Sequence, residues 1–160
     1  MSTAKNGMPE PGAKAPEFEG QTQTGDTVRL SDLRGKKVAL YFYPKDDTPG
    51  CTKQACNLRD DYQQLQEAGI AVVGVSADDV ESHRKFADKY SLPFPLIADP
   101  EHQILEAYGV WGERSLYGRK FMGIQRTTFL IDEEGRVVDT IKRPKVSEHA
   151  REVIKKFGIE

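Results

Sequence analysis

Residues 38–76 read VALYFYPKDDTPGCTKQACNLRDDYQQLQEAGIAVVGVS, and this stretch decides the fold. It begins with the continuous apolar run Val38–Tyr43 and ends with a second run, Ile70–Ser76. Continuous apolar runs of this length are typical of strands that are buried on both faces of a sheet. Two such strands on either side of a polar loop and an amphipathic segment predict a strand–helix–strand unit.

The amphipathic segment between the two runs is predicted to be a helix. Thr48 followed by Pro49 indicates its start, because threonine is a favoured N-cap and proline is favoured at the first helical position. From there apolar residues recur every three or four positions until Gly69, which ends the helix. These residues are Cys51, Ala55, Leu58, Tyr62, Leu65 and Ala68. The pattern therefore places Cys51 in the first turn, on the apolar face.

Further elements follow in the order helix, strand, helix, two strands and helix. They are a helix over 80–90, a strand over 96–98, a helix that starts at Asp99-Pro100, a hairpin of 127–131 and 136–141, and a helix from about Ser147. Trp111, Tyr117 and Phe121 are expected in a loop after the helix that starts at Asp99-Pro100. Strands that alternate with helices predict an α/β domain with a mixed central β-sheet flanked by helices. A β-α-β start and a β-β-α end give the element order of a thioredoxin-like fold.

The composition indicates one globular domain. The chain has 160 residues, of which 38% are hydrophobic and 30% are charged, a size and balance that suit a single core. Residues 1–11 are small, polar and rich in Pro and Gly, and are expected to form a flexible tail before the domain of residues 12–160. The net charge of -2 argues against nucleic-acid binding through bulk charge. No apolar run approaches the roughly 20 residues of a membrane span.

The cellular compartment is predicted from the cysteines and the N-terminus. The chain holds two cysteines, Cys51 and Cys56, which is too few for a disulfide scaffold. The first residues lack the apolar segment of a secretory signal. We therefore expect a cytoplasmic protein, in which any disulfide between the two thiols is transient.

Cys51 is the most informative residue of the chain. The free amide groups and the dipole at a helix start favour negative charge, so a thiol there ionises more readily than a free one. The alternative is that Cys51 is a small buried hydrophobe. Cys56 lies five residues later, about 140° around the helix, and its proximity favours a redox pair. The spacing differs from Cys-x-x-Cys, in which both sulfurs bond within an intact helical turn.

The segment PKDDTPGCT, residues 44–52, resembles the active-site signature Pro-x3-Thr-x2-Cys of peroxiredoxins. With a second cysteine five positions after the first, it is similar to the bacterioferritin comigratory protein or peroxiredoxin Q subfamily. The resemblance extends to residues 12–18, 108–113 and 123–132. Four blocks in the same order cover nearly the whole chain.

This resemblance implies a peroxidase that uses no metal or prosthetic group. It matches Cys51 to the peroxidatic cysteine, whose thiolate attacks a peroxide oxygen. It matches Cys56 to the resolving cysteine, which implies a transient Cys51–Cys56 disulfide. Thr48 matches the hydroxyl that hydrogen-bonds the thiolate and the peroxide. The implied partners are a hydroperoxide substrate and thioredoxin or a similar dithiol reductant, and the implied state is a monomer.

Three further residues have roles in the resemblance. Arg126 matches the arginine that holds the thiolate and polarises the peroxide, Pro44 the proline that shields the cysteine from water, and Gln54 a side chain that supports the arginine. Charge develops on the leaving oxygen when an O–O bond breaks, so fixed donors aimed there accelerate the reaction. Arginine suits this task because it keeps its charge. The alternatives are a solvated arginine at a strand end and, for Thr48, a plain N-cap.

Two other functions remain open. A thiol–disulfide oxidoreductase on the same fold is one, although Cys-x-x-Cys is absent. A metal-binding module that uses both cysteines and a histidine, as in thioredoxin-like copper chaperones, is the other. His83 lies on an apolar stripe and is expected in the core, whereas His102 and His149 lie near helix starts and are expected to be exposed. Turnover of hydrogen peroxide with thioredoxin would support the peroxidase, whereas bound copper without turnover would support the metal-binding module.

Overall fold

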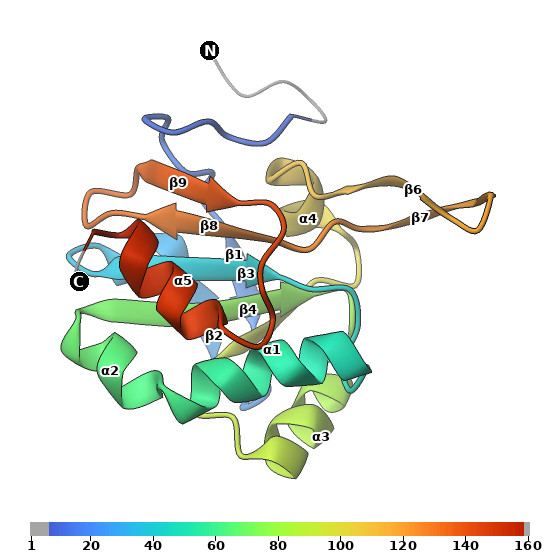
Figure 1. Ribbon diagram of the computed structural model, residues 1–160, viewed down its shortest axis with the longest axis horizontal. Coiled ribbons are helices and arrows are strands. Elements are labelled where there is room, and N and C mark those ends of the chain that lie inside the picture. The colour runs from blue at the N-terminus through green and yellow to red at the C-terminus, as the bar shows by residue number, and fades with distance from the viewer. Residues whose placement is uncertain (1–6, 159–160) are drawn as a thin grey trace.

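The computed structural model describes residues 7–158, apart from the side chain of residue 116. Its centre is a five-stranded sheet of β3 (Lys37–Phe42), β4 (Ile70–Ser76), β5 (Leu96–Ala98), β8 (Thr127–Ile131) and β9 (Val137–Ile141). The strand order is β5-β4-β3-β8-β9 (Figure 1). β3, β4 and β5 run parallel, whereas β8 is antiparallel to both β3 and β9. The predicted mixed sheet is confirmed.

Helices cover both faces of this sheet. They are α1 (Pro49–Asp60), α2 (Tyr62–Glu67), α3 (Val80–Tyr90), α4 (Gln103–Ala107) and α5 (His149–Lys156), with a short 3-10 helix at Leu30–Leu33. α1, α2, α3 and α5 pack on one face, and α4 and the 3-10 helix pack on the other. Figure 1 shows α1 and α5 in front of the sheet. The layered α/β arrangement is that predicted from the element order.

β3 is buried on both faces, which explains its continuous apolar run. Ala39, Tyr41 and Tyr43 belong to the core cluster that includes α1, while Leu40 and Phe42 belong to the cluster on the opposite face. This alternation is the two-residue period of a strand.

The pairing of β3 with β8 brings distant residues to one edge of the sheet. The strands are antiparallel, and Phe42 at the end of β3 pairs with Thr127 at the start of β8. α1 begins soon after β3 ends, and Arg126 immediately precedes β8. Arg126 and the start of α1 therefore meet at the same edge.

Several predicted boundaries need correction. The single helix expected up to Gly69 is two helices, because α1 ends at Asp60 and α2 begins at Tyr62. The helix expected from Asp99-Pro100 begins only at Gln103. Asp99 instead accepts a hydrogen bond from the backbone N–H of Leu105 at 2.8 Å. The last helix begins at His149, two residues after the predicted start.

The predicted loop around Trp111, Tyr117 and Phe121 is wrong. β6 (Trp111–Leu116) and β7 (Arg119–Ile124) pair as an antiparallel hairpin that projects from the body (Figure 1). Tyr117 and Gly118 form its tight turn, and both have a positive φ, of 53° and 78°. Two central residues with positive φ are typical of the turns that match strand twist. A second short hairpin, β1 (Glu19–Gln21) with β2 (Thr27–Arg29), was not predicted either.

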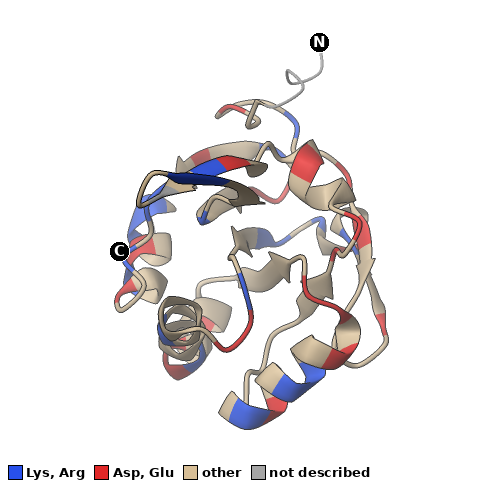
Figure 2. Ribbon diagram, turned by 90° about the vertical axis from the view of Figure 1, so that its right-hand side faces the viewer, with Lys and Arg blue, Asp and Glu red and all other residues tan. Residues whose placement is uncertain are grey.

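The chain termini and the surface complete the fold. Residues 1–6 of the predicted tail lie outside the described residues, and in its remainder Met8 packs against the core and Pro9 is buried. Figure 2 shows Lys and Arg interspersed with Asp and Glu along the helices, in line with the small net charge. Within residues 7–158, no helix has the length and hydropathy of a membrane span.

Candidate active site

Cys51 lies in the first turn of α1, as predicted. Thr48 is the N-cap residue, with φ -98° and ψ 158°, and Pro49 is the first helical residue. The Cys51 side chain is only 1% exposed and packs in the cluster with Ala55 of the next turn. Cys56 is half-buried, and both cysteines are free thiols. The helix thus presents Cys51 at its buried amino end.

Arg126 contacts Cys51 across the 75 residues that separate them in the chain. Its Nη2 donates to the Cys51 Sγ at 3.4 Å, and its Nη1 donates to the Gln54 Oε1 at 2.7 Å. Gln54 is fully buried in α1, one turn after Cys51. The guanidinium is therefore held by α1 with one edge on the sulfur, and the rest of the half-buried side chain lines a surface hollow.

Thr48 and Pro44 lie on the more open side of the site. The Thr48 hydroxyl donates to the backbone carbonyl of Lys45 at 2.9 Å and makes no side-chain cap bond to α1. Thr48 is thus an N-cap by backbone conformation alone. Pro44 follows β3 and is exposed. The two residues flank the loop that leads from β3 into α1.

Cys56 faces a hollow on the surface. This hollow has a volume of about 370 Å³, and its lining includes Cys56, Thr48, Thr52 and Tyr90. Cys51 is not among the lining residues. The two sulfurs consequently lie on different sides of α1, as the helical spacing predicts.

Tyr41 of β3 and Tyr43, which directly follows this strand, pack in the same core cluster as Cys51. Burial raises the pKa of the Tyr41 and Tyr43 hydroxyls well above the ordinary value. Both phenols therefore stay neutral, and the Tyr43 hydroxyl donates to Asp46 Oδ1 at 2.6 Å. Tyr41 stacks on Tyr43 with ring centroids 5.4 Å apart.

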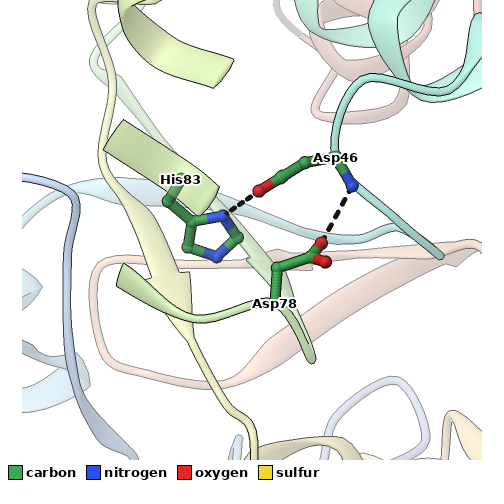
Figure 3. Close-up of side chains that lie close together, drawn as sticks. All are labelled: Asp46, Asp78 and His83. Carbon is green, nitrogen blue, oxygen red and sulfur yellow. Dashed lines mark hydrogen bonds and ion pairs between the residues drawn. The ribbon is translucent and has the colours of Figure 1, made fainter. Parts of the chain in front are cut away.

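His83 is in the core, as predicted, but its partner was missed. Its imidazole is fully buried, and its Nδ1 lies 2.7 Å from Asp46 Oδ2, in the loop before α1 (Figure 3). Asp46, Asp78 and His83 bring their polar atoms within 4.8 Å of one another. This group has the composition of a metal site, yet it contains neither cysteine of the copper-binding alternative.

His102 and His149 were both predicted to be exposed, and neither is. His149 is fully buried rather than exposed, and its Nε2 lies 2.7 Å from the Thr128 hydroxyl. Its Nδ1 lies 3.0 Å from a carboxylate oxygen of Glu152. His102 is half-buried and stacks on Trp111, with ring centroids 3.8 Å apart. Burial of His149 follows from the packing of α5 on β8, which a helix-start position does not reveal.

Comparison with known proteins decides the family. A family model described as the AhpC/TSA family matches residues 11–140. The chain belongs to this family. Its relatives include a bcp peroxiredoxin of Coxiella burnetii, 51% identical over 145 residues that cover 91% of this chain and 96% of the relative. Peroxiredoxin Bcp of Bacillus subtilis is 47% identical over 145 residues, covering 91% and 92% of the two chains.

Solved structures of peroxiredoxins match the fold. Peroxidoxin BcpB from Mycobacterium tuberculosis aligns with a TM-score of 0.82 at 36% identity, covering 94% of this chain and 97% of that one. Peroxiredoxin Q of Xanthomonas campestris aligns with a TM-score of 0.84 at 34% identity, covering 94% and 95%. The protein is thus a peroxiredoxin of the Bcp or peroxiredoxin Q type, with a thioredoxin-like fold and thiol-dependent peroxidase activity.

Proposed function

We propose that this peroxiredoxin reduces hydroperoxides with Cys51 as the peroxidatic cysteine and Cys56 as the resolving cysteine, and that a dithiol protein of the thioredoxin type restores both thiols. The observation that carries the proposal is the 3.4 Å contact between Arg126 Nη2 and the Cys51 Sγ. It pairs a permanent cation with the one thiol that lies at the start of α1. Cations and helix starts both favour a thiolate, which is the nucleophilic form of cysteine.

In the first step the Cys51 thiolate attacks the terminal oxygen of the hydroperoxide. The S–O bond forms as the O–O bond breaks, so the sulfur is oxidised to a sulfenic acid and the peroxide is reduced. The leaving alkoxide or hydroxide takes a proton from solvent and departs as an alcohol or water. Arg126 stabilises the thiolate before attack and the charge on the oxygens during it.

In the second step the Cys56 thiol attacks the sulfur of the Cys51 sulfenic acid. The disulfide forms, and the sulfenic oxygen leaves with two protons as water. The external dithiol then exchanges with this disulfide, becoming a disulfide itself and returning Cys51 and Cys56 to thiols. No metal or prosthetic group is required by these steps, since the thiols supply the electrons.

Three neighbouring residues support the first step in this proposal. The Thr48 hydroxyl turns from the Lys45 carbonyl to bind the thiolate and the peroxide. Gln54 holds the Arg126 guanidinium through the 2.7 Å bond to Nη1. Pro44 covers the approach to the sulfur and limits its contact with water.

Replacing Arg126 with methionine tests its role. The variant keeps much of the apolar stem but loses the donor to Cys51, so we expect the rate with hydrogen peroxide to fall by about 100-fold, the usual effect of removing one such donor. Alkylation of Cys51 by iodoacetamide should slow less, because it depends on the thiolate alone. Arg84→Met, at an exposed arginine of α3 that pairs with Glu81, is the matched control. Equal peroxide rates in the two variants would leave Arg126 without a catalytic role.

Replacing Gly50 with alanine tests how precisely Arg126 must be placed against Cys51. A Cβ at this position would lie 3.1 Å from Arg126 Nη2, so Gly50→Ala pushes the guanidinium by a few tenths of an ångström. We expect a several-fold lower peroxide rate, although alanine stabilises a helix interior by about 1 kcal/mol over glycine. Gly112→Ala is the control, since a Cβ there meets nothing within 4 Å. A Gly50→Ala enzyme as fast as the control would show that the contact tolerates displacement.

The proposal is tested by peroxide consumption coupled to thioredoxin, thioredoxin reductase and NADPH. We expect continuous turnover of hydrogen peroxide and of an alkyl hydroperoxide. If the protein were a thiol–disulfide oxidoreductase, it would reduce a protein disulfide without peroxide turnover. The copper-binding reading predicts stoichiometric metal binding by the cysteines. Either result in place of peroxide turnover would contradict the proposal.

We further propose that the protein acts as a monomer in the cytoplasm. Cys51, Cys56, Gln54 and Arg126 all come from one chain, so the reaction requires no second subunit. Two free thiols suit a reducing compartment. Light scattering of the dithiol and disulfide forms measures the mass directly, and a dimer in either form would contradict the proposal.

A further inference from the structure

The loop between β3 and α1 is held in place mainly by α3. Asp46, at the centre of this loop, is only 7% exposed. Its Oδ1 accepts from the Tyr43 hydroxyl at 2.6 Å, and its Oδ2 accepts from the Ser82 hydroxyl at 2.7 Å and faces His83 Nδ1 at 2.7 Å. Ser82 and His83 belong to α3. A buried carboxylate with these partners fixes the loop to the helix.

His83 itself has two acceptors. Its Nε2 lies 2.9 Å from the backbone carbonyl of Ile97, and its Nδ1 faces Asp46 Oδ2. A carbonyl oxygen only accepts, so Nε2 carries a proton. His83 Nδ1 and Asp46 Oδ2 lie 2.7 Å apart, and a hydrogen bond between them requires a second proton on one of these two atoms. The Asp46–His83 pair therefore holds two protons, has no net charge and is satisfied at both ring nitrogens.

The same loop has a second attachment, to the end of β4. The Asp46 backbone N–H donates to Asp78 Oδ2 at 2.8 Å, and the Ser76 hydroxyl donates to the same oxygen at 2.7 Å. Figure 3 shows Asp46 linked to the His83 imidazole through its carboxylate and to Asp78 through its backbone nitrogen. The facing atoms are already engaged with one another, so this group is accounted for as a hydrogen-bonded anchor without a metal ion.

The anchor acts on strained backbone next to the site. Asp47 has a φ of 59°, an unfavourable region for a residue with a side chain. Thr48 follows it, and the Thr48 hydroxyl donates to Lys45, on the other side of Asp46. Asp47 is also held by Lys89 and Tyr90 of α3, so displacing Asp46 would shift the backbone between these bonds and Thr48.

We propose that His83 is a positioning residue for peroxide reduction: by holding Asp46 it fixes the loop that carries Thr48 and leads into α1, where Cys51 lies. The inference rests on the proposed function of Cys51. His83 touches neither the sulfur nor the peroxide in this account, and it acts through Asp46. Its effect should appear in the reaction that needs the Thr48 hydroxyl and should spare reactions that need only the thiolate.

The first test is His83→Gln, which removes the imidazole that faces Asp46 Oδ2 at 2.7 Å. We expect the second-order rate with hydrogen peroxide to fall by about tenfold or more, since small misplacements of reacting groups have effects of this size. The rate of Cys51 alkylation by iodoacetamide should change by less than about twofold. His102→Gln is the matched control, because that imidazole stacks on Trp111 instead.

The second test is rescue by Asp46→Asn in the His83→Gln background. The double variant places two neutral amides in contact, and one of them can donate to the other. We expect it to be faster with peroxide than His83→Gln alone, a coupling that only interacting residues give. Thermal unfolding of each variant, followed by circular dichroism, establishes that the folded forms are being compared.

The outcomes separate the two proposals. If the wild-type protein consumes no peroxide, the proposed function fails. If the wild type is active and His83→Gln matches His102→Gln, the inference about His83 is overturned. Equal losses in the peroxide and alkylation rates, or no rescue by the second substitution, would also overturn it. Should His83→Gln fail to fold, Ser82→Ala removes a different donor to Asp46, and the same split between the two rates is expected.

Discussion

A Cys51→Ser variant is expected to reduce no peroxide, whereas Cys56→Ser is expected to reduce one equivalent per chain and then stop. Only Cys51 combines burial at the start of α1 with a guanidinium donor at 3.4 Å. A serine hydroxyl stays protonated near neutral pH and is not a peroxide nucleophile. Without Cys56 the first step proceeds at its normal rate, but the sulfenic acid finds no second thiol in the chain.

Single-turnover kinetics measure both variants. Rapid mixing with one equivalent of hydrogen peroxide should give the wild-type rate in Cys56→Ser, and mass spectrometry should find one added oxygen on Cys51 that dimedone traps. Addition of a small thiol should restart turnover. Loss of the first turnover in Cys56→Ser, or residual turnover in Cys51→Ser, would reverse or remove the assigned roles.

The second large effect is the opening of α1 when the disulfide forms. Five residues along an intact helix rise by about 7.5 Å and turn by about 500°, so the Cα atoms of Cys51 and Cys56 are about 8.7 Å apart. A disulfide requires Cα atoms within about 7 Å and side chains that face each other. These side chains point about 140° apart. The bond therefore cannot form while residues 50–58 remain helical.

The contacts of α1 show what must be released. Cys51, Ala55 and Leu58 are buried against the sheet. Asn57 ties the helix to α5, accepting from the Ala150 N–H at 2.8 Å and donating to the Ser147 carbonyl at 2.9 Å. Gly50 in the first turn lowers the cost of opening, because glycine is about 1 kcal/mol worse than alanine in a helix. We expect the disulfide form to have less helix, measured by circular dichroism against the dithiol form. Equal helix content would contradict this geometry.

The sequence predicted the part of the fold that depends on local patterns. β3 and β4 are indicated by the apolar runs at 38–43 and 70–76, and α1 by the helical spacing of apolar residues from Cys51. Burial of one or two faces requires apolar residues at regular positions in the sequence. No local sequence pattern predicts the contact of Arg126 with Cys51. It depends on the antiparallel pairing of β8 with β3, and Arg126 was found only through the family resemblance.

Three further features were not predicted from the sequence, because they also depend on tertiary packing or on exposed strands. Asp46 reads as part of a polar loop, and only the packing of α3 makes it a buried partner of His83. His149 reads as an exposed residue at a helix start, and only the position of β8 buries it against Thr128. The β6–β7 hairpin was missed because its exposed residues lack the alternation of a half-buried strand.

Hydrogen exchange over residues 52–59, read by mass spectrometry on the dithiol and disulfide forms of the same protein, tests the central claim most directly. We propose that Cys51 reacts from an intact α1 and pairs with Cys56 only after this helix opens. This proposal predicts slow exchange in the dithiol form and exchange faster by about 1,000-fold in the disulfide form, equivalent to about 4 kcal/mol of lost local stability. Equal protection in both forms, with the Cys51–Cys56 disulfide confirmed by mass, would contradict it.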